Sequence, residues 1–67
     1  MKNLYLIGGG GHCKSCIDVI ELENKFRIKG IFDIQDKIGD KISGYEIIGD
    51  DKDIEKFDSV NNYFFIS

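Results

Sequence analysis

The glycine run at positions 8–11, with the histidine directly after it, is the part of this chain best suited to bind an anion. It follows the apolar residues 4–7. Glycines in a strand-to-helix turn can take positive φ angles and let a ligand approach the backbone closely. A helix beginning just after them directs its free N–H groups and the positive end of its dipole at the same place, as in phosphate sites. The run of four glycines therefore predicts an anion site, and the ring of His12 could donate to a phosphate or sugar oxygen at its mouth.

The same turn fits the G-x-G-x-x-G fingerprint of dinucleotide-binding domains only in part. Its third glycine falls on Cys13, at a place where glycine normally allows close packing of helix on strand. Asp33 lies roughly where an acidic partner for ribose hydroxyls is expected, about 20 residues downstream. A Rossmann-type site for a nicotinamide cofactor or coenzyme A therefore stays open. So does a regulatory or structural module whose glycine turn binds nothing.

Two cysteines, Cys13 and Cys16, form a C-x-x-C pattern at the start of the expected helix. That position lowers thiol pKa values and can support redox chemistry. With His12 they supply three ligands, whereas a structural zinc site needs four. Both share a helical stripe with Ile17 and Ile20, so we interpret them as small core residues.

Three aspartates, Asp33, Asp36 and Asp40, have a spacing that a cation site could use. Aspartates are equally common in solvated turns, and only Asp33 follows a predicted strand beside the anion site. We therefore expect no metal site. No carboxylate is obviously placed to orient the ring of His12, so we expect no catalytic residue either.

The elements that position these residues follow from hydrophobic patterning. Residues 4–7 and Asn62–Ile66 are largely apolar at successive positions, which predicts strands covered on both faces, with residues 63–66 in the core. Residues 27–34 form another strand, in which Gly30 marks a weak point or a close approach of another backbone. A helix is predicted from His12 to a stop at residues 24–25.

A second, shorter helix is predicted between the last two of these strands. Residues 36–43 are polar and turn-like, and residues 44–49 form a short strand-like piece between glycines. Asp50 suits an N-cap, and the aspartates at positions 51 and 53 suit the first helical turn. Ile54 and Phe57 anchor this helix, which is predicted to end near Asp58.

The order strand, helix, strand, helix, strand predicts an α/β fold with a small, Rossmann-like, three-stranded parallel sheet and right-handed crossovers. Strand order 2-1-3 is favoured over 3-2-1, because it places the two helices on opposite faces. Ligands of such sheets bind at the carboxyl ends of the strands. Since Ser67 follows the last strand directly, we expect a longer protein of which residues 1–67 are the leading domain.

Composition excludes several classes of partner. The net charge is −3, and the nine lysines and arginines are scattered, which argues against nucleic acid. No apolar run approaches the ~20 residues of a membrane span. The first residues do not resemble a secretory signal, and the two cysteines are in keeping with a reducing, cytoplasmic location.

The glycine turn and its helix resemble the N-terminal domain of bacterial sugar acyltransferases. These are the sialic acid O-acetyltransferase family and the related UDP-4-amino-sugar N-acetyltransferases. Residues 7–13 match the family's Gly-Gly-His opening, and residues 17–20 match its helix with valine, isoleucine and aspartate. Residues 30–33 match its second strand, with Ile34 in place of a second aspartate. Residues 44–49 and 63–67 are also similar.

The resemblance implies that this domain holds a UDP-sugar or related sugar. Gly8, Gly10, Gly11 and His12 would contact the diphosphate or sugar, Asp33 would accept hydrogen bonds from ribose or uracil, and Gly9 would tolerate substitution. In the family, a left-handed β-helix follows, binds acetyl-CoA, supplies a catalytic histidine and usually makes the protein a homotrimer. No β-helix repeat occurs in residues 1–67. We therefore expect the domain to carry no cofactor and to leave acetyl transfer to a downstream domain.

Overall fold

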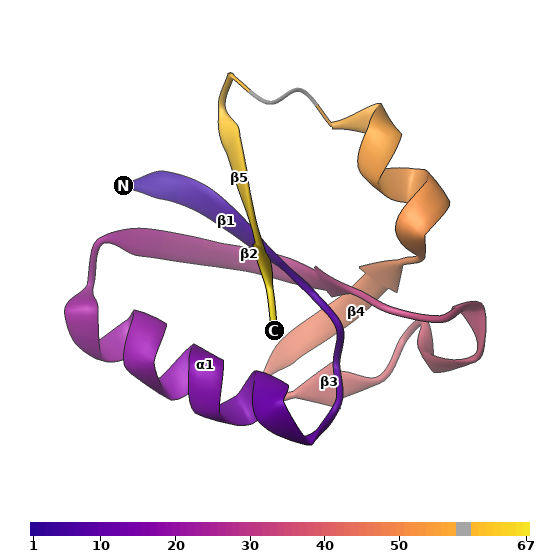
Figure 1. The fold of residues 1–67 in the computed structure, drawn as a ribbon, viewed down its shortest axis with the longest axis horizontal. Helices are drawn as coiled ribbons and strands as arrows, with labels where there is room; N and C mark the ends of the chain where they lie inside the picture. The colour runs from indigo at the N-terminus through magenta and orange to yellow at the C-terminus, as the bar shows by residue number, and fades with distance from the viewer. Residues whose placement is uncertain (58–59) are drawn as a thin grey trace.

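Five strands form one sheet in the order β3-β4-β2-β1-β5, with the helical segments outside it (Figure 1). The structure is a computed structural model and describes residues 1–57 and 60–67. Its elements, in chain order, are β1 (Lys2–Ile7), α1 (Gly11–Glu23), β2 (Phe26–Phe32), the 3₁₀ helix η1 (Gln35–Lys37), β3 (Lys41–Ile42), β4 (Tyr45–Gly49), the 3₁₀ helix η2 (Asp51–Lys56) and β5 (Asn62–Ile66).

The α/β class and the parallel core are confirmed, but the prediction of a three-stranded Rossmann-like sheet is wrong. β2, β1 and β5 are parallel neighbours in the favoured 2-1-3 order. β4 adds a fourth parallel strand beside β2, and β3 pairs antiparallel with β4. Ser43 and Gly44 both have positive φ angles, 51° and 88°, which suits a tight hairpin turn. The turn pairs part of residues 36–43, predicted as a polar turn, with residues 44–49, predicted as an isolated strand-like piece.

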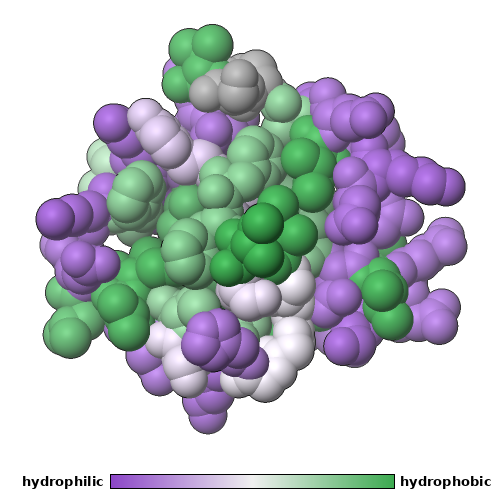
Figure 2. Space-filling model, in the orientation of Figure 1, coloured by the Kyte–Doolittle hydropathy of each residue, from purple (hydrophilic) through white to green (hydrophobic). Residues whose placement is uncertain are grey.

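β5 lies at the edge of the sheet, and this overturns the prediction that residues 63–66 are core. Tyr63 is 40% exposed, Phe65 47% and Ile66 81%, and Phe64 is half-buried. Figure 2 shows apolar surface along the path that β5 takes in Figure 1. Within residues 1–57 and 60–67, β5 pairs with β1 on one side and has no strand on the other, so apolar composition alone does not bury its side chains.

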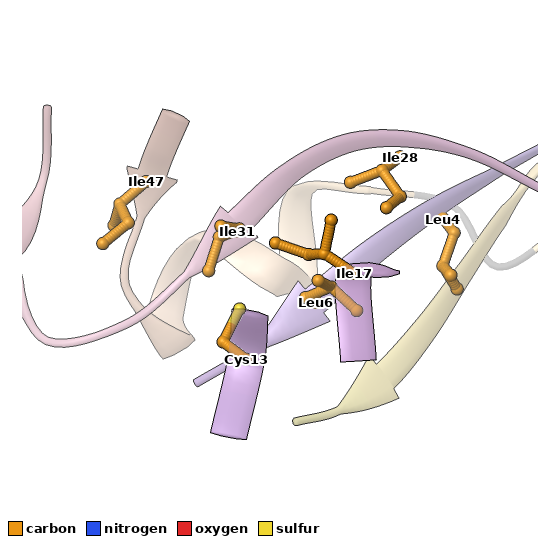
Figure 3. Packing of buried hydrophobic residues seen from close by; sticks show 7 residues of the cluster. All are labelled: Leu4, Leu6, Cys13, Ile17, Ile28, Ile31 and Ile47. Carbon is orange, nitrogen blue, oxygen red and sulfur yellow. The ribbon is translucent and has the colours of Figure 1, made fainter. Parts of the chain in front are cut away.

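The two longer helical segments cover opposite faces of the sheet. Cys13 and Ile17 of α1 pack on Leu6 and neighbouring isoleucines of the sheet (Figure 3). Successive strand residues point to opposite faces, so Tyr5 faces the other side. There its ring centroid lies 4.9 Å from that of Phe57, just after η2. This arrangement agrees with right-handed crossovers in the 2-1-3 order.

Local signals place the ends of the helices well. α1 ends at Asn24, whose φ of 54° and N–H bond to the Ile20 carbonyl form a left-handed cap. Asp50 is the predicted N-cap, and its carboxylate accepts from the Lys52 N–H while Asp53 accepts from the Asp50 N–H. The segment so capped is a 3₁₀ helix, and its predicted end near Asp58 lies outside the described residues.

Candidate functional site

A pocket of about 360 Å³ opens where β1, β2 and β4 reach their carboxyl ends. Its walls come from residues 7–8 of the glycine turn, residues 33–35 after β2 and residues 50–52 after β4. This is the edge at which open parallel sheets bind their ligands. The pocket therefore joins two predicted site residues, Gly8 and Asp33.

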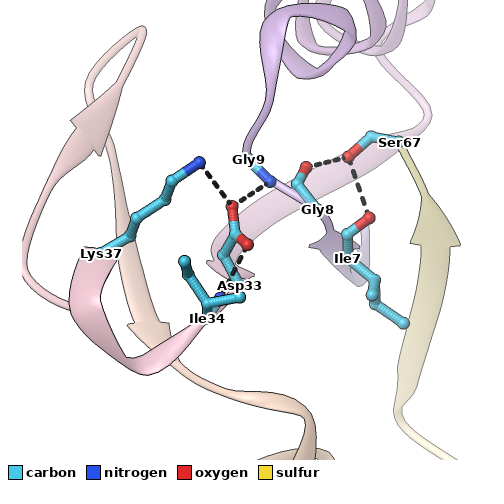
Figure 4. Close-up of polar contacts among 7 residues, drawn as sticks. All are labelled: Ile7, Gly8, Gly9, Asp33, Ile34, Lys37 and Ser67. Carbon is cyan, nitrogen blue, oxygen red and sulfur yellow. Dashed lines mark hydrogen bonds and ion pairs between the residues drawn. The ribbon is translucent and has the colours of Figure 1, made fainter.

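Asp33 ties the glycine turn to the end of β2 (Figure 4). One carboxylate oxygen accepts the Gly9 N–H at 2.7 Å, and the other accepts the Ile34 N–H at 2.7 Å. The ammonium of Lys37 lies 3.6 Å from the first oxygen. The Ile34 hydrogen bond lowers the pKa of Asp33 most, and Gly9 and Lys37 lower it further against the opposing effect of burial. Asp33 is therefore a carboxylate at neutral pH.

This structural role leaves Asp33 able to bind a ligand. A carboxylate has about four lone-pair positions, of which the two backbone N–H groups use two. Its side chain is 14% exposed and lines the pocket. Hydroxyl or imide donors of a ligand can therefore still reach it.

The four glycines play different steric roles. Gly8 has a φ of +101°, and a Cβ there would lie 2.8 Å from the Ser67 carbonyl oxygen. A Cβ at Gly9 would lie 2.9 Å from both an Asp33 oxygen and an Ile42 methyl group, so the tolerance implied for Gly9 requires those side chains to move. Gly10 and Gly11 have nothing within 4 Å of such an atom. The fold thus leaves little space for a side chain at Gly8 and Gly9, whereas Gly10 and Gly11 have free space beside them.

Gly10 and Gly11 lie at the N-terminus of α1, where the backbone is well suited to an anion. Gly10 is the N-cap and makes no side-chain cap, and the first turn carries no acidic residue. The Cys13 N–H bonds to the Gly10 carbonyl at 3.0 Å, and glycine at the N-cap offers no side-chain oxygen to the N–H groups of Gly11 and His12. The structure therefore keeps the predicted anion-binding end of this helix accessible.

His12 lies apart from Asp33. It is exposed in the first turn of α1 and lines a second pocket of about 280 Å³, between α1 and Phe65 of β5. The structure therefore places Gly8 and Asp33 at one pocket and His12 at another. The N-terminus of α1 lies between Gly8 and His12 in the sequence.

Several residues at the first pocket were not predicted as site residues. Asp50, Asp51 and Lys52 were interpreted only as a helix start, yet they line it with Gln35. The signal that could have found them is the short strand at residues 44–49. Once it is recognised as parallel, the loop after it must lie at the carboxyl edge.

Ser67 is a further unpredicted contact of the glycine turn. Its N–H donates to the Ile7 carbonyl at 2.9 Å, and its hydroxyl donates to the Gly8 carbonyl. Ser67 thereby holds the end of β5 against the turn, as Asp33 holds the end of β2 (Figure 4). The glycine turn is therefore fixed from both neighbouring strands.

Neither a metal-binding cluster nor a membrane-spanning helix is found in residues 1–57 and 60–67. Among them, no cluster of three or more histidine, cysteine, aspartate or glutamate side chains is placed to hold a metal ion. No helix within those same residues has the length and apolar character needed to cross a membrane.

Cys13 should resist alkylation in the folded protein. Its side chain is fully buried, and burial raises the pKa of its thiol, so little thiolate forms at neutral pH. Cys16 is half-buried and should react first. Mass spectrometry after timed iodoacetamide treatment measures both rates, and the denatured chain gives the reference. Labelling of Cys13 as fast as Cys16 in the native state would contradict its core position and revive the redox interpretation.

Comparison with known proteins identifies a family that this chain matches. A family model described as the PglD N-terminal domain matches residues 3–67. A protein of Acanthamoeba polyphaga mimivirus, described as uncharacterized protein L142, is 48% identical over 56 residues. That match covers 84% of this chain but 11% of the mimivirus protein, so the chain spans a small part of this curated relative. No solved structure matches the chain.

Proposed function

Because this chain belongs to the family of PglD N-terminal domains, we propose that it is the substrate-binding domain of a sugar acetyltransferase and binds a UDP-linked sugar. One observation carries the proposal. The pocket at the carboxyl ends of β1, β2 and β4 begins at Gly8, two residues before the uncapped N-terminus of α1. A nucleoside diphosphate needs such a pair of sites, one for the nucleoside and one for the phosphates.

The charges at the two sites favour one orientation of the ligand. Asp33, Asp50 and Asp51 line the pocket, with Lys52 as the cation among its lining residues. Carboxylates repel a diphosphate but accept hydrogen bonds from ribose hydroxyls and the uracil imide. The first turn of α1 lacks acidic residues and attracts phosphate. We therefore place the nucleoside in the pocket and the diphosphate at Gly10 and Gly11, with His12 near the sugar.

The acetyl transfer itself is proposed for another part of a longer protein. Acetyl-CoA, the general base that deprotonates the sugar amine or hydroxyl, and homotrimer formation all belong there in this proposal. His12, the one histidine of the sequence, contacts substrate and is not that base. This division leaves the domain with a positioning role, which raises the effective concentration of the sugar at the acetyl thioester.

Binding of UDP-N-acetylglucosamine, measured by isothermal titration calorimetry, tests the proposal. A Cβ at Gly11 meets nothing in the structure, so Gly11→Ala should fold normally. If the diphosphate contacts this backbone, the added methyl group should weaken binding about tenfold, which is ~1.4 kcal/mol. His12→Ala should weaken it by a smaller factor, because His12 is exposed and a single side-chain hydrogen bond contributes about 1 kcal/mol.

The matched control is Asp36→Asn, an exposed aspartate that lines neither pocket, and it should bind like the wild type. The same titration with NAD and coenzyme A separates the alternatives. Affinity for either of these without affinity for the UDP-sugar favours the Rossmann-type cofactor site. A folded protein that binds none of the three contradicts the proposed function and favours a module with an empty turn.

A further inference from the structure

Ile34 is an exposed apolar side chain in the wall of a pocket whose other side chains are mostly polar or charged. It is 58% exposed and lines the pocket at the carboxyl edge together with Asp33, Asp50 and Asp51. It follows β2, which pairs with β1 on one side and β4 on the other, so its exposure is not that of an edge strand. An exposed isoleucine contributes little to a core, and inside a pocket it is available to a ligand.

The backbone of Ile34 is held on both sides, which restricts the direction of its side chain. Its N–H donates to the Asp33 carboxylate at 2.7 Å, and its carbonyl accepts the Lys37 N–H at 3.0 Å. Isoleucine is branched at Cβ, so few side-chain rotamers are open to it on a fixed backbone. The side chain therefore lies beside the Asp33 carboxylate with little freedom (Figure 4). A contact between Ile34 and a ligand then costs little side-chain entropy.

We propose that Ile34 determines specificity in the nucleotide site by packing its side chain against the flat face of the nucleobase. This inference rests on the proposed function, because it concerns the nucleoside half of the same ligand. A pyrimidine base has two apolar faces and carries its hydrogen-bonding groups on its edge. With one face on Ile34, the edge can direct an imide or amino N–H to the carboxylates that line the same pocket.

The other two parts of a UDP-sugar fit the surroundings of Ile34 less well. A diphosphate is repelled by the carboxylates of Asp33, Asp50 and Asp51 and gains nothing from an aliphatic surface. A sugar presents hydroxyl groups around its ring, and an isoleucine side chain offers them no hydrogen-bonding atom. Small-molecule sites combine apolar walls with a few polar groups that fix orientation, and Ile34 with Asp33 supplies both. The nucleobase is therefore the part of the ligand that matches this wall.

Calorimetric titration with UDP and with UDP-N-acetylglucosamine tests the proposal. Ile34→Ala keeps the backbone bonds to Asp33 and Lys37 and removes a side chain that lies mostly in solvent, so the variant should fold like the wild type. Both ligands should bind about fivefold to tenfold more weakly, and by the same factor, because the lost contact is with the nucleoside that they share. The matched control is Ile38→Ala, which should bind like the wild type. Ile38 is 43% exposed and lines neither the pocket at the carboxyl edge nor the one beside His12.

Salt separates this apolar contact from the electrostatic ones. The ratio of the wild-type affinity to the Ile34→Ala affinity should be the same at about 50 mM and about 500 mM sodium chloride, because salt screens charges and not the burial of apolar surface. A ratio that falls as salt is added would show that the substitution acts through the neighbouring carboxylates, and it would contradict the proposed contact.

Nuclear Overhauser effects locate the contact directly. In protein with ¹³C-labelled isoleucine methyl groups, the Ile34 methyl groups should show such effects to the H5 and H6 protons of uracil. Effects to the sugar protons alone, or equal affinities for Ile34→Ala and Ile38→Ala, overturn this inference and leave the proposed function standing. A wild type that binds no UDP-sugar contradicts the proposed function, and this inference falls with it.

Discussion

Replacing Gly8 by alanine is expected to lower the free energy of unfolding by about 2–4 kcal/mol, enough to unfold much of a domain this small. The φ of +101° at Gly8 is a conformation that L side chains rarely adopt. The added Cβ would also lie 2.8 Å from the Ser67 carbonyl oxygen, a backbone atom that cannot rotate away. Relief requires the end of β1 to separate from the end of β5, which breaks the Ser67 contacts with the turn.

Two other glycines separate the causes of this loss. Gly44 has a φ of +88° and nothing within 4 Å of an added Cβ, so Gly44→Ala measures backbone strain alone. Gly10 has neither the positive φ nor a close neighbour, so Gly10→Ala should cost only the loss of a favoured N-cap residue, about 0.5–1 kcal/mol. Urea denaturation followed by circular dichroism ranks the three variants. A Gly8→Ala loss no greater than that of Gly44→Ala would show that the close contact with Ser67 is absent.

Asp33→Asn is expected to cost about 1.5–3 kcal/mol of stability, the worth of one hydrogen bond to a charged group. Asparagine keeps one acceptor oxygen, but its NH₂ group must face either the Gly9 or the Ile34 N–H, both of which now donate to Asp33. The side chain is largely buried, so water replaces the lost bond poorly. If the Gly9 bond is the one lost, the glycine turn is also released from the end of β2. UDP-sugar binding should then weaken even under conditions where the variant is still folded.

The stabilising effect of Asp33 should depend on pH in a defined direction. The folded-state pKa of Asp33 is lowered, chiefly by the Ile34 N–H, so folding favours the ionised form. The contribution is therefore complete above the unfolded-state pKa of about 3.9 and is lost as the pH falls through the lower folded-state pKa. The stability gap between wild type and Asp33→Asn should be full at pH 6–7 and should narrow as the pH falls below about 3.9 toward the lower folded-state pKa.

Two aspartates serve as controls for that titration. Asp36→Asn removes the same charge three residues away, at an exposed position, and should leave the acid limb of the stability curve unchanged. The pKa of Asp53 is also lowered, first by Lys56, so part of the acid limb should survive in Asp33→Asn. Thermal unfolding followed by circular dichroism between pH 7 and pH 3 gives the three curves. A gap between wild type and Asp33→Asn that does not narrow with acid would contradict the ionised hydrogen-bonding role.

Most of the local structure could be predicted from residue type and spacing. Cys13 and Ile17 share the helical stripe that faces the sheet, Asn24 ends α1, and Asp50 caps the next helical segment. Each of these signals acts within one or two turns of chain, where spacing alone decides which groups meet. The expected meeting of Gly8 and Asp33 also holds, since both follow adjacent parallel strands at one edge.

The predictions that fail concern how the strands pair and how much of each strand is buried. The sheet gained β3 and β4 because a two-residue turn at Ser43 and Gly44 reverses the chain, a feature hidden in a polar stretch. β5 was predicted as core because apolar composition reports that a strand is suited to burial, whereas its neighbours determine how much of it is buried. His12 and Asp33, both expected to contact the ligand, line different pockets, a separation that the sequence alone does not show.

The sequence by itself determined the α/β class, the parallel order of β2, β1 and β5, and a glycine turn at the start of α1 that suits an anion. Period, caps and glycine content encode these features locally. Only the tertiary structure decided that Asp33 and Ser67 hold that turn from two sides and that β4 supplies the third wall of the pocket. It alone showed that β5 lies at the edge of the sheet formed by residues 1–57 and 60–67. These features depend on which strands become neighbours. The choice of neighbours depends on pairing between residues far apart in the sequence, and therefore on the free energy of the whole sheet.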